Sequence, residues 1–121
     1  MKSTINLIWI PVSNLEKAVK YYTEVMGLEL KELHPNFGWA ELGGEEGARL
    51  GLSEAKSKAD LTAGSNAVVT FSVKDIEAAK DELGSKGATL VGETMEVAGY
   101  VKLQMVTDSD GNQLQLVQLL Y

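Results

Sequence analysis

An internal duplication constrains the fold of this chain more than any other feature of its sequence. The segment Val-Ser-Asn-Leu-Glu-Lys-Ala that starts at Val12 is matched by Val-Lys-Asp-Ile-Glu-Ala-Ala, which starts at Val73. Farther along, the segment 50–52 (Leu-Gly-Leu) is matched by 114–116 (Leu-Gln-Leu). Many short repeats are typical of a solenoid, whereas two long copies indicate a duplicated module. We expect module 1 at about 1–54, a linker at about 55–65 and module 2 at about 66–121, together forming a single domain.

Each copy is predicted to contain a strand, a helix and three further strands, which makes the fold class α+β. Asn14 and Asp75 precede the two helical patterns and are typical N-caps, while Gly27 and Gly87 follow them as helix terminators. The helices are expected at 15–26 and 76–85. The strands are expected at 4–12, 28–33, 37–42, 48–53, 67–73, 89–97, 100–106 and 113–120.

Composition excludes several classes of function. The 121 residues include no cysteine, so disulfides and thiolate chemistry are absent. The net charge of -6 disfavours a nucleic-acid partner, because phosphate backbones are bound by clustered Lys and Arg. The longest apolar runs, such as 7–10, are too short to cross a bilayer, and the N-terminus leads directly into a strand. We therefore expect a cytoplasmic protein that binds neither nucleic acid nor membrane.

Three motifs resemble a known family. The Val-x-Asn-Leu-x-x-Ala helix start, the Tyr-Tyr-Thr-Glu-Val-Met-Gly-Leu segment at 21–28 and the Asp-Ser-Asp-Gly-Asn turn at 108–112 are similar to those of the vicinal oxygen chelate superfamily. That superfamily includes glyoxalase I, extradiol dioxygenases, fosfomycin-modifying enzymes and bleomycin-binding resistance proteins. The resemblance covers essentially the whole chain. It implies two tandem βαβββ modules that form a curved, half-barrel-like mixed sheet around a cavity, with the helices outside, and it implies a homodimer. Whether modules pair within one chain or between chains stays open.

The resemblance also implies where metal ligands would lie. Carried onto this sequence, the ligand positions are occupied by Leu7, Gly51, Val68 and Gln115, of which only the last has a side chain able to bind a metal. The neighbouring side chains do not supply the carboxylates and imidazoles that such a site needs. His34, the sole histidine, precedes Pro35 in an expected loop. We therefore predict no metal site and no cofactor.

Strand periodicity then predicts which residues line the cavity. Side chains alternate between the two faces of a strand, so residues in register with Leu7 and Gln115 point inward. The middle strands are harder to orient, and an inward Leu103 leaves Lys102 and Gln104 facing water. The predicted ligand-binding residues are Leu7, Trp9, Phe37, Trp39, Glu41, Arg49, Ser53, Thr70, Leu103, Met105, Gln113 and Gln115.

This lining resembles a ligand pocket more than a catalytic centre. Aromatic faces hold planar or cationic groups, which favours a metal-free protein that sequesters an aromatic or cationic small molecule such as an antibiotic. The alternative is a glyoxalase-like lyase or isomerase with an atypical or absent metal site, for which Glu41 is the one weak candidate catalytic base. A third reading is a structural dimer in which Trp9 and Trp39 merely fill the hollow. Glu41 and Arg49 are also compatible with an ordinary ion pair.

Overall fold

The computed structural model describes residues 2, 6–55, 62–64 and 68–121, and it divides the chain into two compact units, Met1–Asn66 and Ala67–Tyr121. The boundary between the units falls at the end of the segment in which the sequence predicts a linker, but most of that linker lies outside the described residues. Within the described part of the chain, no helix is long and apolar enough to span a membrane.

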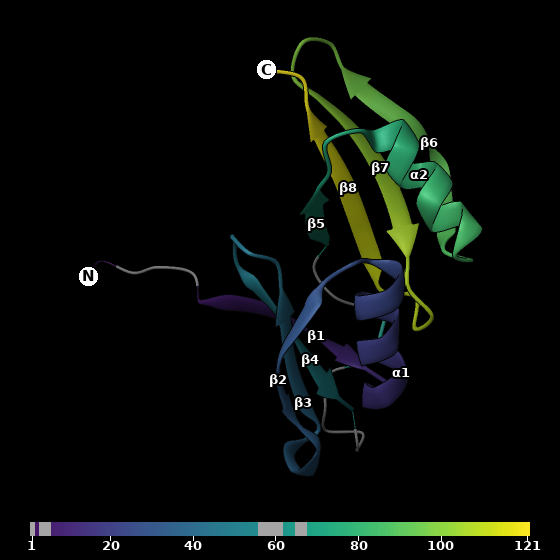
Figure 1. Ribbon diagram of the computed structural model, residues 1–121. Helices are drawn as coiled ribbons and strands as arrows, with labels where there is room; N and C mark the ends of the chain where they lie inside the picture. The colour runs from purple at the N-terminus through teal and green to yellow at the C-terminus, as the bar shows by residue number, and fades with distance from the viewer. Residues whose placement is uncertain (1, 3–5, 56–61, 65–67) are drawn as a thin grey trace. The chain divides into compact units, whose positions relative to one another are not determined.

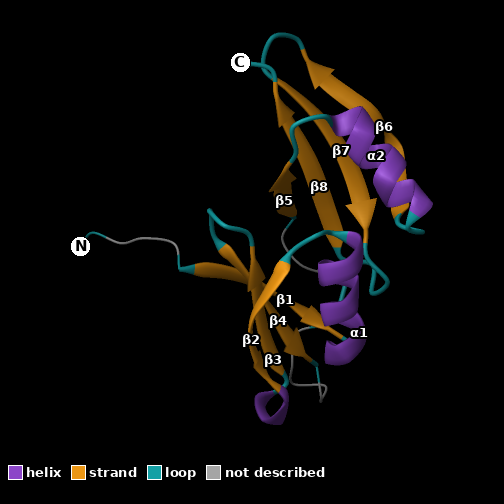
Figure 2. Cartoon of the chain, in the orientation of Figure 1, coloured by secondary structure: helices purple, strands orange, loops and turns teal. Residues whose placement is uncertain are grey.

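Unit 1 is a four-stranded mixed sheet with a helix on one face (Figures 1 and 2). Its strand order is β1-β4-β3-β2, in which β1 runs parallel to β4 and the other neighbours are antiparallel. The last turns of its helix widen into the π-helical segment η1. The elements are β1 (Leu7–Val12), α1 (Leu15–Lys20), η1 (Tyr21–Val25), β2 (Glu29–His34), the 3-10 turn η2 (Pro35–Phe37), β3 (Trp39–Gly43) and β4 (Arg49–Glu54).

Unit 2 repeats this plan, with the strand order β5-β8-β7-β6 and a parallel pairing of β5 with β8. The predicted α+β class and the βαβββ order of each module are therefore confirmed. The closing of the two sheets around a shared cavity stays a prediction. The elements are β5 (Val69–Ser72), α2 (Ile76–Ser85), β6 (Thr89–Val97), β7 (Val101–Thr107) and β8 (Gln113–Leu119).

One face of each sheet forms a hydrophobic core with its helix. Helix α1 packs against β3 and β4, and α2 packs against β6, β7 and β8. Full burial of one large aliphatic side chain contributes roughly 1.5–3 kcal/mol, so these two faces stabilise the units. The other face of each sheet has no helix on it. The buried core residues are Ile10, Val12, Leu15, Ala18, Tyr22, Ala40, Leu42, Leu50 and Leu52 in unit 1, and Ile76, Leu83, Val106, Leu114 and Leu116 in unit 2.

The two helices begin in the same way, as the duplication predicts. The side chain of Asn14 accepts a hydrogen bond from a backbone N–H in the first turn of α1, and Asp75 does so at α2. A second acceptor comes from the last strand of each unit. A carboxylate oxygen of Glu54 accepts from the Leu15 N–H at 2.8 Å, and the amide oxygen of Gln118 accepts from the Ile76 N–H at 2.8 Å. Each helix start thereby satisfies N–H groups that have no partner inside the helix.

The expectation that Gln104 faces water is wrong, because only 1% of this residue is exposed. Gln104 pairs with Leu116 in the sheet register and therefore lies on the helix-covered face. Strand β6 has an irregularity between Val91 and Met95, which frees backbone carbonyl groups. The Gln104 amide donates to the carbonyl oxygens of Val91 and Gly92, at 3.2 and 3.1 Å, so this buried polar side chain compensates for the broken ladder.

Candidate functional site

The helix-free face of unit 1 gathers both tryptophans and a group of charged residues. The register pairs Trp9 with Gly51, Glu41 with Gly51, and Glu32 with Glu41, which places these side chains in one row across all four strands. The neighbouring rows contain Leu7, Arg49, Ser53, Trp39 and His34, again on that face. Of the residues predicted to line the cavity in module 1, all except Phe37 thus share one face of the sheet.

An aromatic corner, formed by Trp9 and Trp39 over Gly51, is the apolar part of this face. A Cβ atom at Gly51 would lie 2.7 Å from Cζ2 of Trp39 and 2.9 Å from Cβ of Trp9, so the Trp39 ring occupies the space above the glycine. The two indole centroids are 6.5 Å apart with an interplanar angle of 65°, an edge-to-face arrangement. Since 41% of Trp9 remains exposed, the corner offers aromatic surface to a ligand.

An ion cluster, formed by Glu32, Glu41 and Arg49, adjoins the aromatic corner. The Glu41 carboxylate accepts from Trp39 Nε1 at 3.0 Å through one oxygen and from Arg49 Nη1 at 3.1 Å through the other. The same Arg49 nitrogen donates to Glu32 at 2.6 Å. Glu32 and Glu41 lie directly opposite each other on adjacent strands, an unfavourable placement of like charges. The guanidinium between them offsets this repulsion.

The electrostatics of the cluster follow from these contacts. The hydrogen bond from His34, at 3.2 Å, and then the one from Arg49 lower the pKa of Glu32 below its ordinary value. Hydrogen bonds to Glu41 and Glu32 raise the pKa of Arg49 above its ordinary value. Glu32 and Arg49 are therefore both ionised at neutral pH, and the ion pairs place two carboxylates around one guanidinium.

Sequence reasoning missed Glu32 and His34. His34 was expected in a loop, but it is the last residue of β2 and pairs with Trp39. A register shift between Leu30 and Glu32 breaks the simple alternation of β2, so the strand pattern gave no reliable signal for the facing of either residue. The placement of Phe37 in a strand is wrong, since this residue ends the 3-10 turn η2 and is 78% exposed.

The helix-free face of unit 2 has a different chemistry. The predicted residues Thr70, Leu103, Met105, Gln113 and Gln115 lie on it according to the sheet register, and Thr70 donates to the Gln115 amide oxygen at 3.2 Å. These side chains are apolar, hydroxyl or amide groups without charge. The residues predicted to bind a ligand in module 2 therefore form no counterpart of the ion cluster.

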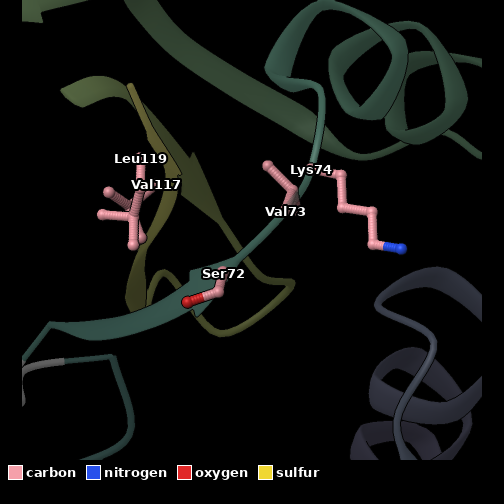
Figure 3. A pocket seen from close by; sticks show the side chains of 5 residues that line it. All are labelled: Ser72, Val73, Lys74, Val117 and Leu119. Carbon is pink, nitrogen blue, oxygen red and sulfur yellow. The ribbon is translucent and has the colours of Figure 1, made fainter. Parts of the chain in front are cut away.

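A shallow hollow opens at the β5 edge of unit 2 (Figure 3). Ser72 and Val117 face each other there across the sheet, and Leu119 extends the apolar side. In Figure 3 the Lys74 ammonium and the Ser72 hydroxyl point in different directions, so no convergent polar group marks this hollow as a site. Val73 completes its lining.

The described residues at the positions that the resemblance implies do not fit a conventional metal centre. At the four positions implied by the resemblance, Leu7 and Gly51 lie on the helix-free face of unit 1, Val68 precedes β5, and Gln115 alone offers a ligand atom. Among the described residues, no three His, Asp or Glu side chains are grouped to hold a metal ion. Where two carboxylates do converge, the cation between them is the guanidinium of Arg49.

The fold therefore defines a protein built from two βαβββ modules, one of which presents an aromatic and charged sheet face. Residues 4–116 match the family model of the Glyoxalase/Bleomycin resistance protein/Dioxygenase superfamily, and the chain belongs to this superfamily.

Two curated relatives are each named "Probable lactoylglutathione lyase". The protein from Vibrio parahaemolyticus serotype O3:K6 (strain RIMD 2210633) is 30% identical over 116 residues, which cover 88% of this chain and 84% of the relative. The protein from Vibrio cholerae serotype O1 (strain ATCC 39315 / El Tor Inaba N16961) is 32% identical over 117 residues, with the same coverage.

Among solved structures, TnmS3, an antibiotic binding protein from Streptomyces sp. CB03234, superposes with a TM-score of 0.79 at 26% identity. The match covers 98% of this chain and 97% of TnmS3. The similarity to known proteins therefore extends both to a protein named as a binder and to proteins named as lyases.

Proposed function

We propose that this protein binds an aromatic or cationic small molecule, such as an antibiotic, without a metal ion, and so sequesters it. The observation that carries the proposal is the aromatic corner of Trp9 and Trp39 above Gly51, held next to the ion cluster on one sheet face. Aromatic rings bind flat compounds by stacking and cations by their π-electrons. The similarity to TnmS3 supports this proposal, because that protein is described as antibiotic binding.

The state of Glu41 further favours binding over catalysis. Both carboxylate oxygens of Glu41 accept hydrogen bonds, one from Trp39 and one from Arg49, and only 16% of the side chain is exposed. A general base needs its carboxylate within reach of the proton that it abstracts. Glu41 instead orients the indole and the guanidinium, which is a positioning role.

A glyoxalase-like lyase or isomerase is the second candidate, favoured by the printed names of the two Vibrio relatives. The residues at the implied metal positions disfavour it, since Leu7 and Gly51 have no ligand atoms. We also propose that the protein is a cytoplasmic homodimer, as the superfamily resemblance implies. Analytical sedimentation measures the mass of the oligomer.

Titration calorimetry with a panel of planar aromatic and cationic compounds tests the binding proposal. We expect at least one compound to bind at micromolar to millimolar concentration, and Trp39→Leu to weaken it by about tenfold through loss of stacking. Tyr100→Leu is the matched control, because it removes an exposed aromatic ring from unit 2, away from the predicted ligand-binding residues. Sensitivity to Tyr100→Leu with indifference to Trp39→Leu would contradict the proposed site.

Equilibrium dialysis against divalent nickel, zinc and manganese, combined with an assay for lactoylglutathione formation, tests the second candidate. The binding proposal expects neither stoichiometric metal nor turnover. A bound ion with metal-dependent activity would replace it by the lyase.

A further inference from the structure

We infer that the ligand of the aromatic corner is a planar aromatic compound with a hydrogen-bond acceptor oxygen at its edge and no negative charge. This inference rests on the proposed function and narrows its ligand class. It follows from which polar groups on this face already have partners and which do not.

All four carboxylate oxygens of the ion cluster already accept hydrogen bonds. Glu41 accepts from Trp39 Nε1 at 3.0 Å and from Arg49 Nη1 at 3.1 Å. Glu32 interacts with His34 Nε2 at 3.2 Å and accepts from Arg49 Nη1 at 2.6 Å. Each carboxylate oxygen of the cluster therefore already has a hydrogen-bond partner within the protein.

The groups that remain without partners are donors. Arg49 uses only its Nη1 nitrogen, so among the described residues its Nε–H and Nη2–H groups have no acceptor. The Nε1–H of Trp9 is likewise without an acceptor in the described part of the chain, and Trp9 is 41% exposed. The Arg49 side chain is 44% exposed, so its free edge is open to a ligand. The free groups on this face are therefore hydrogen-bond donors, which bind acceptor atoms of a ligand.

The net charge of the cluster decides between a neutral and an anionic acceptor. Two carboxylates surround one guanidinium, and the surplus negative charge repels an anion. A carbonyl or ether oxygen on a ring without negative charge avoids this repulsion. The ring stacks on the corner while the oxygen accepts from the guanidinium edge.

Three bicyclic probes of similar size separate these possibilities: coumarin, which is neutral with a carbonyl, naphthalene, which has no acceptor, and 2-naphthoate, which is an anion. Calorimetric titration is expected to rank coumarin first, about tenfold tighter than naphthalene, because a hydrogen bond to a charged donor is worth about one order of magnitude in affinity. Nitrogen-15 NMR should show the Arg49 Nε–H signal shifting with coumarin and not with naphthalene.

Arg49→Lys is the variant that tests the assigned donor. It keeps a positive charge between Glu32 and Glu41, so the fold is expected to survive, but it removes the free guanidinium edge. Coumarin affinity should fall about tenfold to that of naphthalene, whose own affinity should not change.

Each outcome decides something different. Tighter binding of naphthalene or 2-naphthoate than of coumarin, or coumarin binding that depends on Trp39 but ignores Arg49→Lys, would overturn the inference and leave the proposed function standing. No binding of any probe up to its solubility limit would overturn both.

Discussion

The indole ring of Trp39 in strand β3 lies on the backbone of Gly51 in the adjacent strand β4. Any larger residue at position 51 would displace this ring. The space that a Cβ would need at position 51 is taken by Cζ2 of Trp39, at 2.7 Å, and by Cβ of Trp9, at 2.9 Å. Gly51 has no unusual backbone angle to explain it, since its φ is not positive. The glycine is therefore explained by the ring above it.

Gly51→Ala is expected to destabilise the protein by about 1–3 kcal/mol, the usual cost of overpacking, and to weaken aromatic ligands in parallel. Both effects arise because the Trp39 ring must tilt away. Urea denaturation and the tryptophan emission spectrum measure them. Gly44→Ala is the matched control, since its Cβ would meet only a backbone oxygen at 3.7 Å and should change stability little. Equal tolerance of both substitutions would contradict the packing described.

The hydrogen bond from the Leu15 N–H to Glu54 predicts that two substitutions of Glu54 destabilise the protein to different extents. Glu54→Leu should lower the free energy of unfolding by about 1–3 kcal/mol, because a partly buried N–H group loses its acceptor. Glu54→Gln should cost much less, because Gln118 performs the same task at the start of α2 in unit 2. Denaturant titration compares the two. Comparable losses for both variants would show that charge, and not the acceptor, holds the α1 start.

The hydrogen bonds of Gln104 in β7 predict a large loss of stability when this residue is replaced by an apolar residue of similar size. Gln104→Met keeps the buried volume but leaves the carbonyls of Val91 and Gly92 without their donor, so a loss of about 1–3 kcal/mol is expected. Hydrogen exchange should show the loss concentrated in β6. Gln113→Met, at an exposed position of the neighbouring strand, is the control and should be close to neutral. An unchanged exchange pattern in β6 would contradict the proposed role.

The lowered pKa of Glu32 predicts acid sensitivity of unit 1. The native carboxyl releases its proton below the ordinary value of 4.5, so the folded state binds fewer protons than the unfolded state in that range. Its stabilising contribution is therefore fully present above the unfolded pKa and is lost as pH falls through the folded pKa. Unfolding measured between pH 6 and about pH 3 should show this slope. Glu32→Gln should make the slope shallower, and an unchanged slope would contradict the assigned contacts.

The sequence by itself determined the duplication and the order of the helices and strands, because these depend on local patterns. The N-caps Asn14 and Asp75, the span of α2 and the span of β6 are set by residues next to one another in the chain. The alternation of strands also placed Trp9, Arg49 and the other strand residues of module 1 on one face.

Only the tertiary structure decided how that face is organised. The register shift in β2 places Glu32 opposite Glu41 and His34 opposite Trp39, and the irregularity in β6 leaves carbonyl groups for the buried Gln104. The turn at 35–37 carries Phe37 out of strand β3. These placements depend on which strands pair and in what register. The two-residue alternation of side chains along a strand cannot predict these placements, because a single extra residue reverses the facing of all side chains that follow it.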